Sequence, residues 1–371
     1  MHRMTTLLCV LALTASLTAP TLAAAATDEE AAANATTDLD PELEAELGRA
    51  IDLGITYLRG QQADDGAWSD SVGVTALALR AQLESPQAMP GDDPMIEKGV
   101  AFILKHVNDD GSISETNHNR NYNTAVAMTT LAATGEPKYE AVIADAQRFL
   151  QGLQLDEADG YEPSHNYYGG IGYGGDERPD LSNLYMALEA MKATDLDPDD
   201  PLWDKALTFV TRSQNNSETN DIEVSVDDGG FAYMPNYSPH GEGRSYGGMT
   251  SAGLLSLLFA GVDKTDPRVQ AAYDWIRANY TVETNPNATG KQGLFYYYNA
   301  FAKAMAAYGE PLVTDTDGVS HDWRRDLGKR LLALQDADGS WVNKDSSRWW
   351  EGDPNLVTSW SLIALNHIHG R

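Results

Sequence analysis

The sequence predicts an all-α protein, an α/α toroid in which six outer and six inner helices form a closed double ring. Three observations support this prediction. A helix pair repeats six times, one helix of each pair is amphipathic while the other is apolar nearly all round, and one class of connection is almost constant in length. An amphipathic helix belongs at the outside of a layered fold and an apolar helix inside it, so the two kinds should alternate between rings.

The chain begins with a segment that is typical of export. His2 and Arg3 precede an apolar run over residues 7–17, and a cluster of alanines ends at residue 26. We therefore expect residues 1–26 to be a cleaved signal peptide and the mature protein to be secreted or periplasmic; a retained anchor is the alternative, although the run is short for one. An acidic flexible leader is expected over 27–45 and a single toroid domain over 46–371.

The expected outer helices share an aromatic or large apolar residue at one register. Clear copies lie at 51–58, 96–103 and 143–150, and three more surround Phe209, Trp275 and Leu331. The expected inner helices are rich in small apolar residues and cover 74–79, 124–128, 183–188, 250–255, 298–303 and 358–363. Apolar residues recur at steps of three and four in the outer set, which is the period of an amphipathic helix.

The connections predict where a site lies. Four of the five steps from an inner to the next outer helix take 25–27 residues, whereas the steps from outer to inner take 18–41. In a closed ring all outer-to-inner loops emerge on one side, which we call the long-loop rim; the opposite side is the short-loop rim. Insertions gathered on one rim indicate the binding face. An open solenoid is the alternative architecture.

Composition excludes several functions. The 371 residues carry a formal net charge of −29, which disfavours nucleic acid and anionic membrane surfaces as partners. The only cysteine, Cys9, lies in the expected signal peptide, so the mature chain has no disulfide and no thiolate metal site. We expect no membrane span after the signal, no metal and no cofactor.

Aromatic and charged residues gather in the predicted long-loop rim. The candidates for ligand binding are His165, Tyr168, Arg178, Tyr246, Tyr296, Tyr297, Tyr298, Asn299, Trp349 and Trp350, and the candidate acids are Asp176, Asp228, Glu351 and Asp353. Aromatic side chains with a few charges at the mouth of an apolar cavity are typical of a ligand site. The alternative is that these residues pack the long loops onto the ring.

A second pattern is a polar residue at one register of all six inner helices. Its members are Thr75, Thr124, Asn183, Thr250, Tyr298 and Thr358. They could form a polar collar in the lumen, or they could bind free backbone N–H groups where helices start.

A loop motif carries a family resemblance. A Gln precedes Asp-Gly-x-Trp in the first copy, at Asp65, Gly66 and Trp68, and again in the last copy, at Asp338, Gly339 and Trp341. This pattern resembles the Gln-Trp repeat of squalene cyclases and protein prenyltransferase β subunits, and in particular exported prenyltransferase/squalene-oxidase-repeat proteins. The resemblance covers residues 45 to 370 and implies an α/α toroid.

The catalytic signatures of these families carry over poorly. The Asp-x-Asp-Asp proton donor of squalene-hopene cyclases has one literal match, at 197–200, but it lies on the short-loop rim between prolines and is expected to be a solvated turn. The prenyltransferase zinc site needs a cysteine that the mature chain lacks.

Three functions remain open from the sequence. The first is binding or processing of an apolar isoprenoid-type ligand in the central cavity, with Asp176, Asp228, Glu351 or Asp353 as proton donor and aromatic faces stabilising cations. The second is a carbohydrate-active (α/α)6 enzyme or glycan binder, in which Glu351 would pair with Asp176 or Asp228. The third is a toroid that binds a protein without chemistry. Catalysis and oligomeric state are left open.

Overall fold

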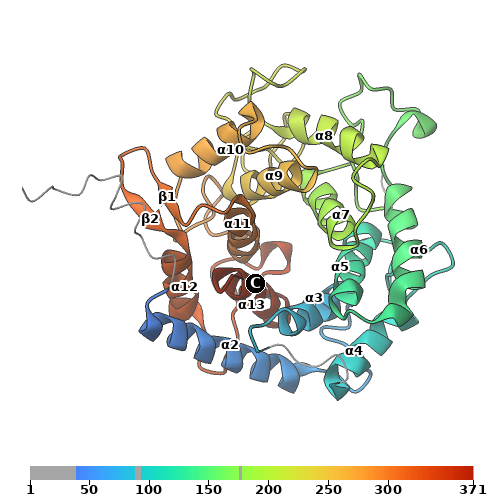
Figure 1. Cartoon of the computed structure of the whole chain (residues 1–371), viewed down its shortest axis with the longest axis vertical. Helices are drawn as coiled ribbons and strands as arrows, with labels where there is room; N and C mark the ends of the chain where they lie inside the picture. Colours follow the sequence, from blue (N-terminus) through green and yellow to red (C-terminus); the bar gives the residue numbers. More distant parts are fainter. Residues whose placement is uncertain (1–38, 88–92, 175–177, 371) are drawn as a thin grey trace, which may run out of the picture. The chain divides into compact units, whose positions relative to one another are not determined.

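The computed structural model describes residues 39–87, 93–174 and 178–370, so the expected signal peptide lies outside the described part (Figure 1). The described residues form twelve α-helices that alternate between two rings. The outer helices are α2 (Pro41–Gln61), α4 (Pro94–Lys105), α6 (Glu140–Gln151), α8 (Pro201–Ser213), α10 (Pro267–Ala278) and α12 (Trp323–Leu334). The inner helices are α3 (Val72–Leu83), α5 (Arg120–Ala133), α7 (Leu181–Ala193), α9 (Gly247–Phe259), α11 (Leu294–Tyr308) and α13 (Pro354–Ile368). Helix α2 begins at Pro41, inside the stretch expected to be leader.

The inner ring is closed. Each inner helix packs against the next inner helix along the chain, and α13 packs against α3 (Figure 1). The outer ring closes at the same place, because α12 contacts α2. The predicted α/α toroid is therefore confirmed, and the open solenoid is excluded.

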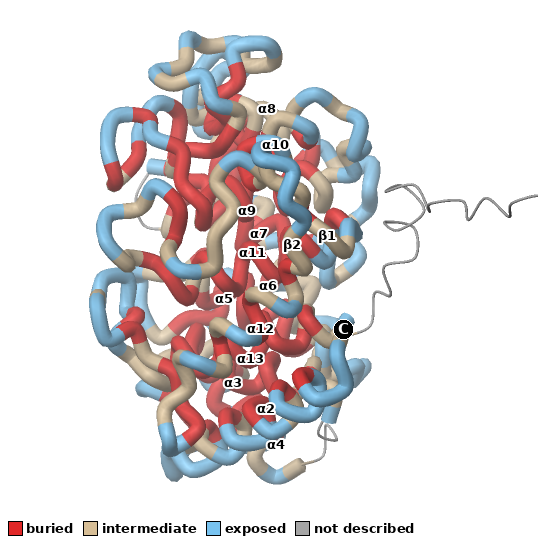
Figure 2. Tube along the Cα trace, turned by 90° about the vertical axis from the view of Figure 1, so that its left-hand side faces the viewer, coloured by how far each residue is buried: buried red, intermediate tan, exposed pale blue. Residues whose placement is uncertain are grey.

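Burial differs between the two rings as the sequence predicts. Helix α3 buries every residue from Val72 to Gln82, whereas α4 buries only one face, which includes Ile96, Val100 and Ile103. The buried positions form a continuous core between and inside the rings, and the exposed positions lie on the outer helices and in parts of the loops (Figure 2).

Four outer helices begin with the same dipeptide, an aspartate followed by a proline. The carboxylates of Asp40, Asp93, Asp200 and Asp266 each accept a hydrogen bond of 2.8–2.9 Å from the backbone N–H two residues further on. Proline suits the first helical position because the N–H that it lacks has no partner within a helix. Asp200, the last residue of the Asp-x-Asp-Asp match, is thus a helix cap.

The Gln and Gly of the loop motif join neighbouring repeats. In the first copy, Gln62 Nε2 donates to the Gly66 carbonyl at 3.1 Å and to the Met95 carbonyl of α4 at 3.0 Å. Gly66 has a φ of +98°, and a Cβ there would lie 2.2 Å from the Lys98 carbonyl oxygen, so only glycine fits. In the last copy, Gln335 donates to the Ala50 carbonyl of α2 at 2.9 Å. The motif therefore ties the first and the last loop to the next outer helix, and the last of these contacts joins the two ends of the ring.

The repeated threonines of the inner helices hold the same loops from inside. Thr75, Thr124, Thr250 and Thr358 are fully buried, and each Oγ1 accepts a loop backbone N–H, from Trp68, Ile113, Phe231 and Trp341 respectively, at 2.9–3.1 Å. These threonines fix the loop geometry; they neither line the lumen as a collar nor cap their own helices.

The fifth inner-to-outer connection is longer than the others because it contains a hairpin. Strands β1 (Leu312–Thr314) and β2 (Ser320–Asp322) pair antiparallel between α11 and α12, with Val313 opposite His321. The described part of the chain also contains three 3-10 turns, at η1 (Pro137–Tyr139), η2 (Glu157–Asp159) and η3 (Arg348–Trp350). Among the described residues, no helix combines the length and the apolarity that crossing a bilayer requires.

Candidate functional site

Charged side chains from three alternate inner helices meet near the short-loop end of the lumen. Glu189 on α7 lies between Arg80 on α3 and Lys303 on α11, with its Oε1 2.9 Å from Arg80 Nη2 and 2.8 Å from Lys303 Nζ. The three side chains, which we call the ionic triad, are at most 8% exposed. Tyr185 adds its hydroxyl 3.3 Å from Lys303 Nζ. The lumen is therefore not an apolar channel along its whole length.

The Glu189 carboxyl of the ionic triad stays ionised at neutral pH. Burial by itself would raise the pKa of Glu189, but the attraction of Arg80 and Lys303 outweighs burial and holds this pKa well below the ordinary value.

The opposite half of the lumen ends in a group of tyrosines at the long-loop rim, which we call the tyrosine mouth. It consists of Tyr122, Tyr173, Tyr233, Tyr246 and Tyr296, from α5, α11 and the third and fourth long loops. The hydroxyls of Tyr173 and Tyr233 lie 3.4 Å apart. Tyr296 places its hydroxyl 3.0 Å from Ser182 Oγ and its ring edge-on to Trp360 of α13, with centroids 5.8 Å apart.

Among the described residues, one fully buried acid faces the tyrosine mouth. Asp180 is the N-cap of α7 and is fully buried; its Oδ1 accepts the Asn183 N–H at 2.9 Å and its Oδ2 accepts Asn183 Nδ2 at 2.8 Å. Burial raises the pKa of Asp180 to about 6, and the hydrogen bonds from Asn183 and the Tyr233 hydroxyl offset only part of that effect. Asp180 is therefore an acid that is partly protonated near neutral pH.

The environment of Asp180 is phenolic rather than cationic. Burial, followed by the charge of Asp180, raises the pKa of Tyr173 and of Tyr233, so both phenols stay neutral. Arg178, an exposed residue, is the cation that lowers the pKa of Asp180, and its contribution is the smallest of the causes. A weakly acidic carboxyl among neutral aromatic hydroxyls is suited to donate a proton.

The structure brings together only part of the predicted ligand-binding set. Tyr246 and Tyr296 belong to the tyrosine mouth, and Arg178 lies near it. Tyr297 and Tyr298 point away from the lumen, since their hydroxyls donate to the carbonyls of Thr281 at 2.8 Å and Val282 at 2.6 Å.

The remaining predicted binding residues lie in other places. Asn299 is buried, and its Nδ2 donates to the Trp360 carbonyl of α13 at 3.3 Å. His165 is exposed, and its Nδ1 accepts the Tyr167 N–H at 3.1 Å, while the Tyr168 hydroxyl donates to Glu157 at 3.0 Å. Trp349 and Trp350 are exposed on the sixth long loop.

The predicted acids that the structure describes hold the backbone in place. Glu351 is fully buried and accepts the N–H groups of the first three residues of α11 at 2.7–3.0 Å, together with Asn343 Nδ2 at 2.6 Å. Asp353 caps α13 through the Asn355 N–H at 2.8 Å. Asp228 accepts the Ser245 hydroxyl at 2.6 Å and Trp275 Nε1 at 3.1 Å. Asp176 lies outside the described residues.

Sequence reasoning missed Asp180. The signal that could have found it is its position directly before an inner helix. A residue at that point caps the helix, and the cap of a buried helix is itself buried, so an acid there becomes a buried acid.

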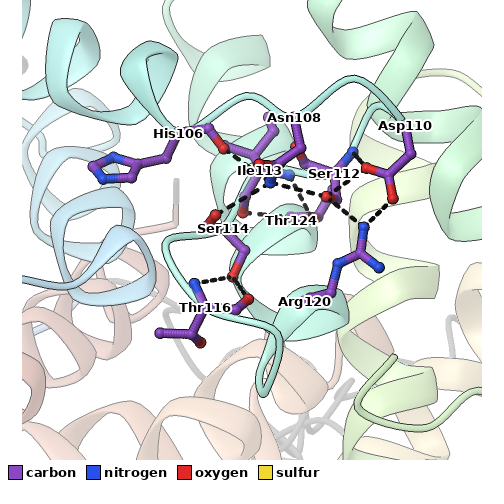
Figure 3. Close-up of polar contacts among 9 residues, drawn as sticks. All are labelled: His106, Asn108, Asp110, Ser112, Ile113, Ser114, Thr116, Arg120 and Thr124. Atoms are coloured by element: carbon purple, nitrogen blue, oxygen red, sulfur yellow. Dashed lines mark hydrogen bonds and ion pairs between the residues drawn. The ribbon is translucent and has the colours of Figure 1, made fainter. Parts of the chain in front are cut away.

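A polar cavity of about 640 Å³ lies in the second long loop. Its lining consists of Asn108, Asp109, Asp110, Ser114, Glu115, Thr116, Asn117 and Arg120. Arg120, at the start of α5, reaches back to Asp110 and Ser112, and the hydrogen bond from Arg120 lowers the pKa of Asp110 to about 2 (Figure 3). Within the described residues no group of three His, Cys, Asp or Glu side chains could hold a metal ion.

Comparison with known proteins supports the fold and leaves the chemistry open. No family model and no curated protein matches the chain. A protein from Actinoplanes of known structure is 15% identical, with 87% of this chain and 99% of that chain covered and a TM-score of 0.54. The type II terpene cyclase MstE from Scytonema is 13% identical, with 89% and 98% covered and a TM-score of 0.52.

An α-1,6-mannanase of Salegentibacter, solved as an inactive variant with α-1,6-mannotriose, is similar to the same extent. It is 12% identical, with 87% of this chain and 99% of that chain covered and a TM-score of 0.53. At these identities the similarity shows a shared fold alone, and that fold serves both terpene cyclases and glycoside hydrolases. The chain has the α/α toroid fold of these enzymes.

Proposed function

We propose that this protein is a toroid enzyme of the terpene-cyclase type, which binds an apolar isoprenoid chain at the tyrosine mouth and protonates it from Asp180. The observation that carries the proposal is the buried Asp180 carboxyl, whose pKa is raised to about 6 among aromatic side chains. Protonating an alkene requires a carboxylic acid that its surroundings keep neutral. Near pH 7 about a tenth of such a group is protonated, and excluding more water with a bound ligand would increase that share.

The proposed step uses only groups of this chain. The proton of the Asp180 carboxyl would bond to one carbon of a terminal C=C bond, using the π electron pair, and would leave a tertiary carbocation on the other carbon. The faces of Tyr296 and Trp360 would stabilise this cation. The Asp180 carboxylate left behind keeps its hydrogen bonds from Asn183 and is reprotonated from solvent through the Tyr173 and Tyr233 hydroxyls.

The test is turnover of linear isoprenoids, such as geranylgeraniol and squalene, in heavy water. We expect a cyclised product that carries one deuterium from the initiating step, and Asp180→Asn should reduce turnover by at least a hundredfold while keeping the helix cap. Asp353→Asn is the matched control, because Asp353 caps another inner helix and is not among the groups that shift the pKa of Asp180. Equal turnover by wild type and Asp180→Asn would contradict the proposal.

A carbohydrate-active toroid is the second candidate, and the polar cavity of the second long loop favours it. Its lining of carboxylates, amides and hydroxyls suits a sugar better than an isoprenoid. Glu115 would be one carboxyl of a catalytic pair, with Asp109 as the other. Hydrolysis of a glycan panel that is lost in Glu115→Gln and retained in Asp180→Asn would favour this function over the first.

We also propose that the protein is exported after removal of residues 1–26. The support is the basic start, apolar run and alanine cluster of the sequence. Amino-terminal sequencing of the protein from the medium or the periplasm should find a new terminus close to residue 27.

A further inference from the structure

Two consecutive tryptophans are exposed on the sixth long loop. Trp349 is 39% and Trp350 is 61% exposed, and their φ angles are +56° and +67°. The left-handed region costs a non-glycine residue about 1–3 kcal/mol, and large exposed aromatic side chains give up favourable burial. Trp349 packs against Gly293 at the start of α11 and against His240, whereas Trp350 is the more exposed of the two, so the loop presents mainly the Trp350 indole.

The loop that carries the indoles is fixed from below. Glu351, the residue after Trp350, accepts three backbone N–H groups of α11, and Asn343 is bonded to both Glu351 and the Lys291 carbonyl, the latter at 2.8 Å. These hydrogen bonds hold the sixth loop against the fifth loop. The two indoles are therefore preorganised, which lowers the entropic cost of binding a ligand on them.

A buried histidine next to Trp349 has an unused hydrogen-bond donor. His240 is 7% exposed, and its ring packs between Tyr246 at 4.6 Å and Trp349 at 5.5 Å between centroids. Its Nδ1 accepts the Thr289 N–H at 3.1 Å, so the neutral ring carries its proton on Nε2. Nε2 is buried and has no hydrogen-bond partner among the described residues. Such a group calls for an acceptor oxygen.

Two arginines complete the surroundings. Arg244 and Arg348 both lie close enough to His240 that their charges lower its pKa, after burial. Within the described residues neither arginine has an ion-pair partner, although the chain contains 55 acidic residues. Arg348 lies over the Trp349 ring, with Cζ 4.6 Å from the centroid, and donates to Gln292 Oε1 at 3.1 Å. Two guanidinium groups beside exposed indoles suit an anionic ligand.

We propose that His240, Arg244, Arg348, Trp349 and Trp350, which we call the tryptophan patch, bind an acidic saccharide. A pyranose ring has an apolar C–H face and a polar edge, which match a flat indole bordered by hydrogen-bond donors. A carboxylate or sulfate on that ring would meet the guanidinium groups, whose paired N–H donors suit such oxyanions. An apolar ligand would leave both arginines unpaired.

The tryptophan patch is separate from the proposed proton donor. Tyr246 lies between them, since it packs on His240 and is also close to Asp180 and Tyr296. The patch contains no carboxyl, so it would bind saccharide without cleaving it. This inference therefore stands or fails independently of isoprenoid turnover.

The experiment measures binding of polygalacturonate and dextran sulfate by calorimetry, with fully methyl-esterified polygalacturonate and plain dextran as uncharged twins. We expect wild type to prefer at least one acidic polymer over its twin by tenfold or more. Trp350→Ala should weaken that binding at least tenfold, and Arg244→Gln with Arg348→Gln should abolish the preference for the acidic form.

Two control variants separate this site from general surface effects. Val319→Ala removes an exposed apolar side chain from the β1–β2 hairpin, and Arg148→Gln removes an exposed arginine from α6; both should bind as wild type does. The proposal is overturned if neither acidic polymer binds, if the uncharged twins bind equally well, or if Trp350→Ala binds as tightly as wild type. The last result would reveal electrostatic adsorption only.

Discussion

Helix α7 carries two buried acids that behave in opposite ways. Glu189 lies near its C-terminal end with two cations within 3 Å, and its pKa is lowered; Asp180 caps its N-terminus among tyrosines, and its pKa is raised to about 6. Both side chains are almost completely withdrawn from water. The difference therefore comes from the neighbours and not from burial.

The comparison assigns different tasks to the two ends of the lumen. Glu189, which two cations keep ionised, joins three inner helices but has no proton to donate to a ligand near neutral pH. A carboxyl without a close cation contributes less to stability but is available for proton transfer. The positions of lysine and arginine thus decide which end of the lumen joins helices and which end holds an acid that can donate a proton.

The largest expected effect comes from breaking the ionic triad. Glu189→Ala leaves Arg80 and Lys303 buried without their shared partner and should lower the free energy of unfolding by about 3–5 kcal/mol. Glu84→Ala, which removes the more exposed partner of Arg80, should cost less than about 1 kcal/mol after solvent screening. Urea unfolding followed by circular dichroism measures both.

A triple replacement shows whether Glu189→Ala loses stability because two buried charges lose their partner or because the smaller side chain leaves a cavity. Arg80→Met, Glu189→Met and Lys303→Met together remove all three charges and keep the volume, so this variant should be within about 2 kcal/mol of wild type. If Glu189→Ala is as stable as wild type, the triad does not join the inner helices, and the structural task assigned to Glu189 is wrong.

The fold was predictable because it depends on features that repeat. Six copies of an outer and an inner helix, a loop motif with Gln and Gly, and a constant step on one rim all indicate a closed ring, and the ring closes where α13 meets α3. Each copy shows the same sequence pattern, so a helix that is unclear in one copy can be located from the others.

The site was less predictable because it depends on side chains that no repeat places. Tyr296, Tyr297 and Tyr298 are neighbours in sequence, yet only Tyr296 faces the lumen, since a helix turns by about 100° per residue. Glu351 looked like a catalytic acid but caps α11, which only the three-dimensional path of the sixth loop reveals. The ionic triad joins residues more than 100 positions apart and has no local pattern at all.

The second prediction uses pH to separate the two acids. The folded-state pKa of Asp180 is raised above the unfolded value near 4, so the native state binds more protons and its stability falls as the pH rises from about 4 to 6. The loss should reach about 2–3 kcal/mol. Glu189 has the opposite sign, because its lowered pKa gives stability that is present above pH 4 to 5 and is lost as the pH falls further.

The measurement is the free energy of unfolding of wild type and Asp180→Asn between pH 4 and pH 7. The variant lacks the titrating group, so its stability relative to wild type should improve by about 2–3 kcal/mol over this range. Parallel curves for the two proteins would show that Asp180 titrates normally and would remove the basis of the proposed proton donor.

The smallest effect concerns two adjacent tyrosines on α11. Tyr297→Phe leaves the Thr281 carbonyl without its 2.8 Å hydrogen bond and should cost about 1 kcal/mol of stability without a change in ligand binding. Tyr296→Phe loses a 3.0 Å contact with Ser182 at the half-buried mouth, where water can replace it, so its cost in stability should be smaller and its effect on isoprenoid binding larger. Thermal unfolding and ligand titration of the two variants give the two readouts.

The reverse order, with Tyr297→Phe weakening ligand binding and Tyr296→Phe leaving it unchanged, would place the ligand between the rings instead of in the lumen.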